Sequence, residues 1–353
     1  MTTVAEVVDA VIGVDTHRDT HTLELTSPVG ATVAVLEISN TSQGYTEAIR
    51  WITEHAPGPR IMTGLEGTRS YGVGLSRALQ AAGLVVVEIE RPKRAQRRGK
   101  GKSDPIDARL ACLSLLRMDT SALPQPRTDG DREALRILLI SRAEQTLTQT
   151  RQSNQLHALL LTGSDADRAV GKGRFTQTRL RAVIGRPVPT DASVEAQVRH
   201  DEASRLAQAI LLAEQSLIAN KHSLRAIVHS VQASLLDMRG VGPVSAAQAL
   251  VTFSHHRRFR NEAAFAMVNG SAPLLASSGQ TSRHRLNRGG DRAMNRALHT
   301  IVMTRWRTCP ETADYITKRR AQGKPDREIR RCLKRYVSRQ LFREMTPTTL
   351  DNT

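Results

Sequence analysis

Aromatic residues are scarce in this chain of 353 residues, which has five Phe, four Tyr and two Trp. Stacking of bases on aromatic side chains is therefore not expected to be a main mode of binding. Cysteine is also scarce, and Cys112, Cys309 and Cys332 are too widely spaced to predict a disulfide framework or a zinc site. No apolar run approaches the roughly 18 residues of a membrane-spanning helix, and the first residues lack the basic segment of a signal peptide. We therefore expect a cytosolic protein without membrane contact.

Acidic residues are outnumbered, with 34 Asp and Glu against 51 Lys and Arg, which gives a formal net charge of +17. An excess of this size indicates a polyanionic partner, and nucleic acid fits better than a membrane surface because no spanning or anchoring segment is found. The length favours two or three domains, since single cores rarely grow beyond about 250–300 residues.

The pattern from residue 8 to 116 is mixed. Short apolar runs predict strands at Ala10–Val14, His21–Leu25, Ala31–Leu36, Ile61–Leu65 and Leu84–Ile89. Helical periodicity appears in Thr46–Glu54 and Gly74–Ala82. Three strands followed by helix, strand, helix and strand predict a mixed α/β sheet flanked by helices, as in RNase H-like domains.

Four acidic residues in this region have the contexts expected of a divalent-metal site. Asp15 ends one short apolar run and Glu66 ends another. Asp104 and Asp107 are three residues apart, so a helix that begins near Pro105 would point both carboxylates the same way. Cleavage of phosphodiesters with two Mg²⁺ ions needs oxygen ligands around ions about 4 Å apart. The four carboxylates are therefore candidate metal ligands and catalytic residues, although strand ends and helix caps also carry such residues.

Three other polar residues lie in the same motifs. His17 and His21 follow Asp15, and we expect a surface or supporting position for both rather than direct metal binding. Arg109 could position a scissile phosphate or pair with Asp107, and the sequence does not decide between these roles.

A basic segment, Arg91–Lys102, carries seven positive charges in twelve residues directly before Asp104. A basic loop beside carboxylates suits a nucleic-acid backbone, although a solvated linker has the same composition. The candidate backbone contacts are Arg94, Arg97, Arg98, Lys100 and Lys102. The segment ends like a Walker A loop, but Gln96 stands where the first glycine of that motif would be, so we reject an ATP-binding loop.

The region 128–235 has long helical patterns. Leu206, Ile210, Ala213, Leu217, Asn220, Leu224, Ile227 and Val231 follow the alternating spacing of four and three that forms a coiled-coil seam. An earlier helix, Asp131–Leu161, repeats apolar residues at similar spacing. The two helices could form a hairpin within the chain or pair between subunits, and the length of the seam favours dimerisation.

The last third begins with helix, glycine turn and helix over Leu236–Leu250, the helix-hairpin-helix pattern. Such a turn, here with Gly240 and Gly242, aims a helix N-terminus at a phosphate, although ordinary helix turns also contain glycine. Further on, Ser277 and Ser278 precede a glycine in an arginine-rich stretch. A hydroxyl beside arginines could attack a phosphodiester, although Ser-Ser-Gly is more commonly just a loop. The candidate backbone contacts there are Arg283, Arg285 and Arg288. Lys318–Arg335 adds a basic helical face.

Taken in order, these motifs resemble the transposases of the IS110 family, in the group that includes IS1111. The motifs are Gly13–His21, Gly64–Thr68, Lys102–Arg109, Gly240–Gly242, Gly270–Gly279 and Arg288–Arg292. The resemblance implies a RuvC-like catalytic domain at 1–118, a helical coiled-coil dimerisation region at 128–235 and a C-terminal transposase domain at 236–345. The acidic tetrad of the family maps onto Asp15, Glu66, Asp104 and Asp107, and its nucleophilic serine maps onto Ser278, with Ser277 adjacent.

The resemblance also implies a mechanism and partners. Such a recombinase excises and inserts double-stranded DNA at element ends and target, guided by a structured RNA, with Mg²⁺ or Mn²⁺ at the carboxylates. Attack by the serine gives a phosphoserine link that keeps the bond energy, so rejoining needs no ATP. A homodimer or tetramer in the bacterial cytoplasm, at the nucleoid, is implied.

Two other classes of protein stay open at this point. A metal-dependent, structure-specific nuclease would use the same carboxylates with water in place of the serine. A nucleic-acid-binding protein without catalysis would use the basic surface alone. A covalent protein–DNA adduct separates the recombinase from the first, and strand scission separates it from the second.

Overall fold

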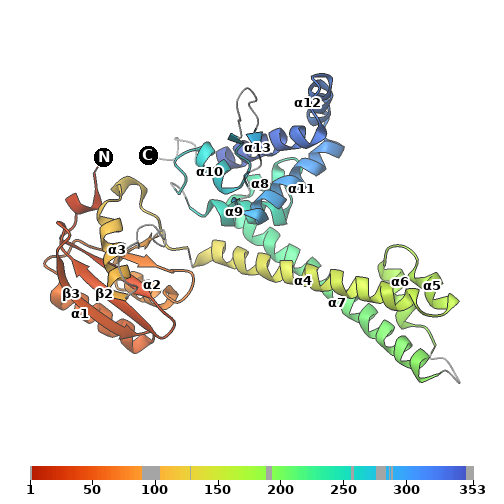
Figure 1. Cartoon of the computed structure of the whole chain (residues 1–353), viewed down its shortest axis with the longest axis horizontal. Coiled ribbons are helices and arrows are strands. Elements are labelled where there is room, and N and C mark those ends of the chain that lie inside the picture. The colour runs from red at the N-terminus through yellow and green to blue at the C-terminus, as the bar shows by residue number, and fades with distance from the viewer. Residues whose placement is uncertain are drawn as a thin grey trace. The chain divides into compact units, whose positions relative to one another are not determined.

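The computed structural model describes residues 2–89, 104–127, 129–187, 193–255, 258–275, 284–285, 287 and 289–346. The chain forms two compact units (Figure 1). Unit 1 comprises Met1–Glu133 and Phe253–Asn261, and unit 2 comprises Ala134–Thr252 and Glu262–Thr353. The predicted division at 1–118, 128–235 and 236–345 stays a prediction.

Unit 1 is built on one five-stranded sheet. Its strands are β1 (Ala10–Thr16), β2 (Thr20–Thr26), β3 (Thr32–Ser39), β4 (Ile61–Glu66) and β5 (Val85–Ile89). They lie in the order β3-β2-β1-β4-β5, with the first three antiparallel and β1, β4 and β5 parallel. The mixed sheet expected from the sequence is confirmed. Because β1 lies at its centre, the strand is buried on both faces and reads as a continuous apolar run.

Helices cover both faces of this sheet. The helices α1 (Ser42–His55) and α2 (Val73–Ala81) share a core with Ile12 and Val14 of β1. The helix α3 (Asp104–Leu116) shares the opposite core with Val11. Short 3-10 helices lie at Val4–Glu6 and Thr120–Ala122. Alternate side chains of β1 therefore pack against helices on opposite faces of the sheet. The end of β1 lies between these two helical layers.

Two long helices, α4 (Gly130–Leu161) and α7 (Val194–Gln232), dominate the first part of unit 2. Asn220 donates to the carbonyl oxygen of Leu138 at 2.9 Å, and Arg142 donates to that of Leu217 at 2.8 Å. The predicted seam is thus engaged inside the chain, as the hairpin alternative required. Pairing of a second copy along it stays a prediction.

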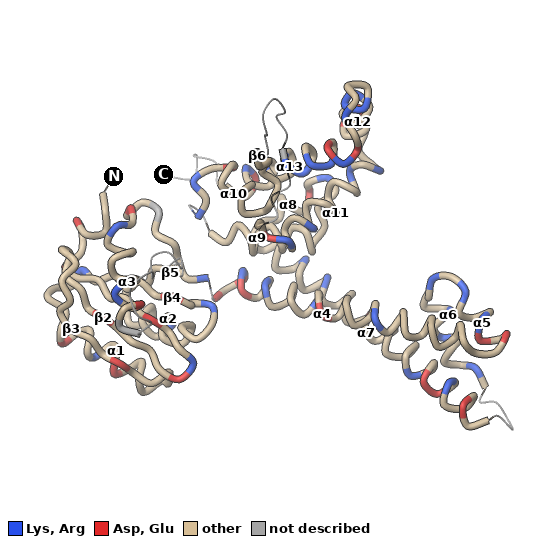
Figure 2. The backbone as a smooth tube through the Cα atoms, in the orientation of Figure 1, with Lys and Arg blue, Asp and Glu red and all other residues tan. Residues whose placement is uncertain are grey.

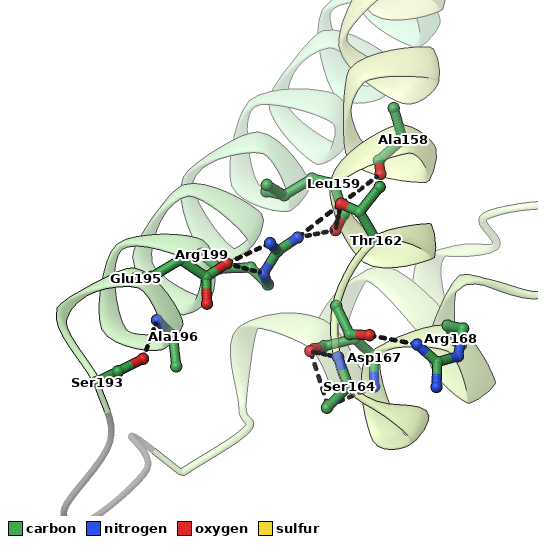
Figure 3. Close-up of polar contacts among 11 residues, drawn as sticks. Ala158, Leu159, Thr162, Ser164, Asp167, Arg168, Ser193, Glu195, Ala196 and Arg199 are labelled. Carbon is green, nitrogen blue, oxygen red and sulfur yellow. Dashed lines mark hydrogen bonds and ion pairs between the residues drawn. The ribbon is translucent and has the colours of Figure 1, made fainter.

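The far end of this hairpin has its own small core and polar caps (Figure 3). It carries α5 (Asp165–Gly171) and α6 (Gln177–Ile184). Ser193 caps the start of α7 by accepting from the amide of Ala196. Arg199 on α7 donates to the carbonyl oxygen of Leu159 on α4 at 2.5 Å. These bonds fix the start of one long helix against the end of the other.

In the rest of unit 2, the described residues form helices and one pair of short antiparallel strands. Its elements are α8 (Ser234–Asp237), α9 (Pro243–Phe253), α10 (Glu262–Val268), β6 (Leu274–Leu275), β7 (His284–Arg285), α11 (Arg292–Thr308), α12 (Pro310–Ala321) and α13 (Asp326–Met345). Phe265 of α10 is fully buried, and its ring lies 5.9 Å from that of Phe342 on α13. Among the helices that the structure describes, none is long and apolar enough to cross a membrane.

Candidate active site and nucleic-acid interface

Two predicted metal ligands lie on neighbouring strands at the centre of the sheet. Val14 of β1 pairs with Leu65 of β4 in parallel register, so the next residues, Asp15 and Glu66, come side by side. Side chains alternate along a strand, so both carboxylates face the side opposite Val14 and Leu65, which is the side of α3. Asp15 is only 7% exposed.

Gly13 lets α3 approach this face of the sheet. A Cβ atom at Gly13 would lie 2.0 Å from the carbonyl oxygen of Ala108 and 2.7 Å from the Cys112 nitrogen, so the helix backbone rests directly on β1. Further along the helix, Cys112 shares a core with Val11. The helix therefore runs antiparallel to β1, and its first turn, with Asp104 and Asp107, lies toward the Asp15 end.

The donor set suits a hard divalent cation. Asp15 and Glu66 share one face of the sheet, Asp107 lies on the helix that covers this face, and carboxylate oxygens are the ligands that Mg²⁺ and Mn²⁺ prefer. The backbone of Asp104 is described but its side chain is not. Within the described side chains, no three of His, Cys, Asp and Glu come close enough to hold an ion. By ligand type, Asp15, Glu66 and Asp107 fit a hard divalent cation.

The neighbouring polar residues have definite places. His17 Nε2 lies 3.2 Å from Asp15 Oδ2, so this histidine contacts a predicted ligand. His21 is fully buried and bonds to Asn40 at 3.0 Å instead. Arg109 donates to Glu24 Oε1 on β2 at 3.1 Å. Its partner is therefore a buried carboxylate outside both roles considered from the sequence, and the pair ties α3 to the sheet.

Several predicted residues lie outside the described part of the chain. They are Arg94, Arg97, Arg98, Lys100, Lys102, Ser277, Ser278, Arg283 and Arg288. Arg285 is described, on β7, where it is exposed. The roles of all of these residues stay predictions.

The described residues on either side of the segment that carries Ser278 lie close together, and they form the base of that segment. The strands β6 and β7 pair through Leu274 with Arg285, and in the sequence they stand before and after the segment that carries Ser278. Gly270 has a φ of 70°, and a Cβ at Gly290 would lie 2.5 Å from the Gly270 nitrogen. Only glycine permits this approach, which brings the two ends of the segment together.

Asparagines connect this base to the helices behind it. Asn295 of α11 donates to the carbonyl oxygen of Asn269 at 2.9 Å and accepts from Lys334 of α13 at 2.8 Å. The buried Asn269 donates in turn to Ser338 of α13 at 2.7 Å. The sequence alone does not reveal these residues, because nothing in their local spacing shows that they meet.

The predicted glycine turn joins α8 to α9. Gly240 has a φ of 78°, and a Cβ there would lie 3.1 Å from the Ile301 carbonyl oxygen. Arg305 donates to the carbonyl oxygen of Arg239 at 2.7 Å, which holds the turn against α11. Gly242 is exposed and a Cβ there would meet open space. The first helix of the pair is only four residues long.

Two family models match the chain. A model for the DEDD transposases of IS110 elements, described as "Transposase", matches residues 12–163. A second, described as "Transposase IS116/IS110/IS902 family", matches residues 232–317. The chain belongs to the IS110 family of transposases. The first match spans the sheet with its four carboxylates, which confirms the RNase H-like fold predicted for unit 1.

A curated insertion-element protein is also similar to part of this IS110-family chain. The "Insertion element IS110 uncharacterized 43.6 kDa protein" of Streptomyces coelicolor is 36% identical over 98 residues. These residues are 27% of this chain and 24% of that protein, so the match spans about a quarter of the relative.

The IS110-family chain also carries a cluster of arginines around Glu88 of β5, all within unit 1. Arg127 donates to both Glu88 carboxylate oxygens, with Nε at 2.7 Å from Oε2, and Arg69 lies 3.8 Å from Oε1. Burial and mutual repulsion lower the pKa of Arg132 and of Arg258 to about 10. Burial would raise the pKa of Glu88, but the Arg127 bond and the nearby arginines hold it below its ordinary value.

Arg258 reaches this cluster on a segment far away in the sequence. Phe253–Asn261 belongs to unit 1 although the helices on either side of it belong largely to unit 2. Ser254, directly after α9, has a φ of 73° and is the one non-glycine residue with positive φ among those described. Its strained conformation turns the chain sharply, and a residue held so needs support from its surroundings.

We expect Glu88→Gln to lower the free energy of unfolding by about 3–5 kcal/mol, because it leaves buried arginines without their counter-charge. The folded-state pKa of Glu88 is depressed, so its contribution is present at neutral pH and is lost as pH falls below about 4.5. Urea unfolding between neutral and acid pH measures both effects. Glu37→Gln, on the exposed side of β3, is the matched control and should change little. Equal stability of the two variants would contradict the role of Glu88.

The two turn glycines are expected to respond differently to alanine. Gly240→Ala forces a side chain into positive φ against Ile301 and should lower the free energy of unfolding by about 1–2 kcal/mol. Gly242→Ala should leave thermal unfolding nearly unchanged and weaken DNA binding, because its methyl group occupies the space that a phosphate would enter. Unfolding and fluorescence anisotropy with a DNA duplex measure the two properties. Unchanged DNA affinity of Gly242→Ala would remove the turn from the interface.

Proposed function

We propose that this protein is a DNA transposase that excises and inserts an element by serine attack on phosphodiesters, with Ser278 as the nucleophile. The observation that carries the proposal is the pair Asp15 and Glu66, side by side beneath the first turn of α3. This is where an RNase H-like sheet presents carboxylates to a phosphodiester. The match of 232–317 to a transposase family, across the serine segment, supports the second half of the mechanism.

The carboxylates and the serine have separate tasks in this mechanism. Asp15, Glu66, Asp104 and Asp107 would hold Mg²⁺ or Mn²⁺, and His17 would keep the Asp15 carboxylate in position through its 3.2 Å contact. The bound ions supply stabilisation of negative charge around the reacting phosphate. Ser278 forms a bond to phosphorus as the bond to the departing sugar oxygen breaks. The link conserves the energy of the phosphodiester for rejoining.

The proposed partners are double-stranded DNA, at element ends and target, and a structured guide RNA. The net charge of +17 supports polyanionic partners, and the low aromatic content supports contacts to backbone and shape. Activity in the bacterial cytoplasm, at the nucleoid, follows from these partners.

A homodimer, or a tetramer of two dimers, completes the proposal. Large apolar side chains are exposed along both long helices, at Ile137, Ile140 and Leu147 of α4 and at Leu212 and Ile218 of α7. Exposed apolar rows on a helical hairpin are typical of surfaces that pair with another copy.

The test is an excision assay in cells, with the gene in its native flanking DNA and amplification across the rejoined circle junction. Junctions are expected from the unaltered protein and from Ser277→Ala, and from neither Asp15→Ala nor Ser278→Ala. Junctions that survive in Ser278→Ala but are lost in Ser277→Ala would move the nucleophile to Ser277. Junctions that survive in both serine variants would favour attack by water. Without any junction, scission and binding assays on purified protein separate a nuclease from a protein that only binds.

A further inference from the structure

Unit 2 contains a groove of about 1390 Å³ between the base of the serine segment and α13. One wall is formed by Gly270–Leu274 with Arg285 of β7, and the other by α13 and the residues just before it. Pockets for small molecules are usually about 300–1,000 Å³ and mostly apolar. The size and the charged lining of this groove suit part of a polymer better than a small molecule.

The charge of the groove is strongly one-sided. Among the described residues that line it, seven are Lys or Arg and one, Glu328, is acidic. Glu328 is already paired with Lys324 at 3.1 Å. Arginines recur at every fourth position of α13, so they lie along one side of the helix over about 18 Å. They are Arg327, Arg331, Arg335 and Arg339, and Figure 2 shows Lys and Arg in blue along this helix.

The hydrogen bonds of these arginines leave capacity for an anion. In the described part of the chain, Arg327 and Arg331 have no carboxylate within ion-pair distance. Arg335 and Arg339 share the single carboxylate of Glu262, and Nη1 of Arg335 is buried without a hydrogen-bond partner. The guanidinium of Arg335 is therefore only partly satisfied by Glu262.

The opposite wall has a second group of this kind. Ser271 lines the groove, and its buried hydroxyl has no hydrogen-bond partner among the described atoms. Ser271 is held in place because its amide donates to Asn269 Oδ1 at 3.0 Å. Each wall therefore contains a polar atom that no described protein atom satisfies.

We infer that this groove binds the sugar–phosphate backbone of the DNA strand that Ser278 attacks. This inference rests on the proposed function, because DNA is chosen as the ligand from the position of the wall Gly270–Leu274, next in sequence to the segment that carries Ser278. Gly270–Pro273 leads into β6, and the segment that carries Ser278 follows β6 in the sequence. A DNA strand whose phosphates contact α13 would lie beside the paired strands β6 and β7, between which Ser278 stands in the sequence. The arginine forks bind phosphate oxygens in pairs, whereas the sequence of bases is not read.

The experiment compares two double variants in a Ser278→Ala background by fluorescence anisotropy with a short DNA duplex. The test variant is Arg327→Gln/Arg331→Gln, inside the groove. The control is Lys221→Gln/Arg225→Gln, which removes the same charge at the same spacing from exposed positions of α7 outside the groove. In about 0.1 M salt the test variant should bind the DNA duplex at least about tenfold more weakly than the control does. Its slope of log affinity against log salt should be shallower by about 2 than the control's.

A charge-retaining variant tests the chemistry independently of folding. Arg327→Lys/Arg331→Lys should keep most of the salt slope, and thermal unfolding should be the same for all variants. Equal slopes for the test variant and the control would overturn the inference. Loss of affinity for a structured RNA with unchanged affinity for duplex DNA would also overturn it, in favour of an RNA site.

Two outcomes separate the role of the groove from the role of Ser278. If the protein with Ser278 intact forms no serine–DNA adduct but the groove variant still loses DNA affinity and salt slope, the proposed nucleophile fails and the groove remains a backbone site. If adducts form and the groove variant binds DNA as the control does, the proposed function stands and the groove is excluded.

Discussion

Asp15→Asn is expected to abolish formation of the serine–DNA adduct, with a loss on the order of a thousandfold or more. The amide has nearly the shape of the carboxylate but lacks its charge, so the proposed metal site loses a ligand at a buried position. Asp15 is only 7% exposed, at the centre of the sheet. The measurement is adduct yield on gels with Mg²⁺ or Mn²⁺, using DNA that contains an element end.

A control on the same strand–turn unit makes the result specific. Asp19 lies in the turn between β1 and β2, where its carboxylate is exposed and pairs with Arg18 at 2.9 Å. Asp19→Asn should retain full adduct formation. Binding of a divalent ion stabilises a folded protein, so Mn²⁺ should raise the melting temperature of the unaltered protein and of Asp19→Asn, and not that of Asp15→Asn. Adduct yields of Asp15→Asn equal to those of the control would exclude the proposed metal site.

Gly13→Ala is expected to impair both stability and catalysis. Its Cβ would lie 2.0 Å from the Ala108 carbonyl oxygen, and neither the helix backbone nor the central strand can yield locally. Overpacking of this kind costs about 1–3 kcal/mol or more. Because α3 carries Asp104 and Asp107, its displacement would also separate those carboxylates from Asp15. A misplacement of about 1 Å can cost on the order of a hundredfold in rate.

The Gly13→Ala prediction is checked by urea unfolding together with adduct yield at a temperature where the variant remains folded. Gly185→Ala is a suitable control, since a Cβ at that helix end would make only ordinary contact at 3.4 Å, with the Arg181 carbonyl oxygen. A folded Gly13→Ala variant with normal adduct yield would mean that the position of α3 does not matter for the reaction.

Local patterns sufficed to predict most of unit 1. The predicted strand Ala10–Val14 is part of β1, and the predicted helix Thr46–Glu54 lies within α1. The positions of Asp15 and Glu66 at strand ends follow from the same patterns, because apolar runs mark buried strands and a polar residue marks where burial ends.

Contacts between distant parts of the chain could not be predicted in this way. Nothing local shows that Arg258 joins a cluster at Glu88, or that Arg109 pairs with Glu24 rather than with Asp107. The seam with Asn220 was compatible with pairing inside or between chains, since the spacing of apolar residues is the same in both. Only the three-dimensional arrangement supplies these partners.

The close packing of α3 on Gly13 also governs the thiol chemistry of the chain. Burial raises the pKa of Cys112 to about 12, so almost no thiolate exists there at neutral pH. Cys309 and Cys332 are partly exposed, and Cys332 lines the groove beside α13. Exchange of Cys309 for serine would therefore leave one readily alkylated position. A fluorophore attached to Cys332 would report directly on what enters the groove, and the buried Cys112 would not need to be replaced.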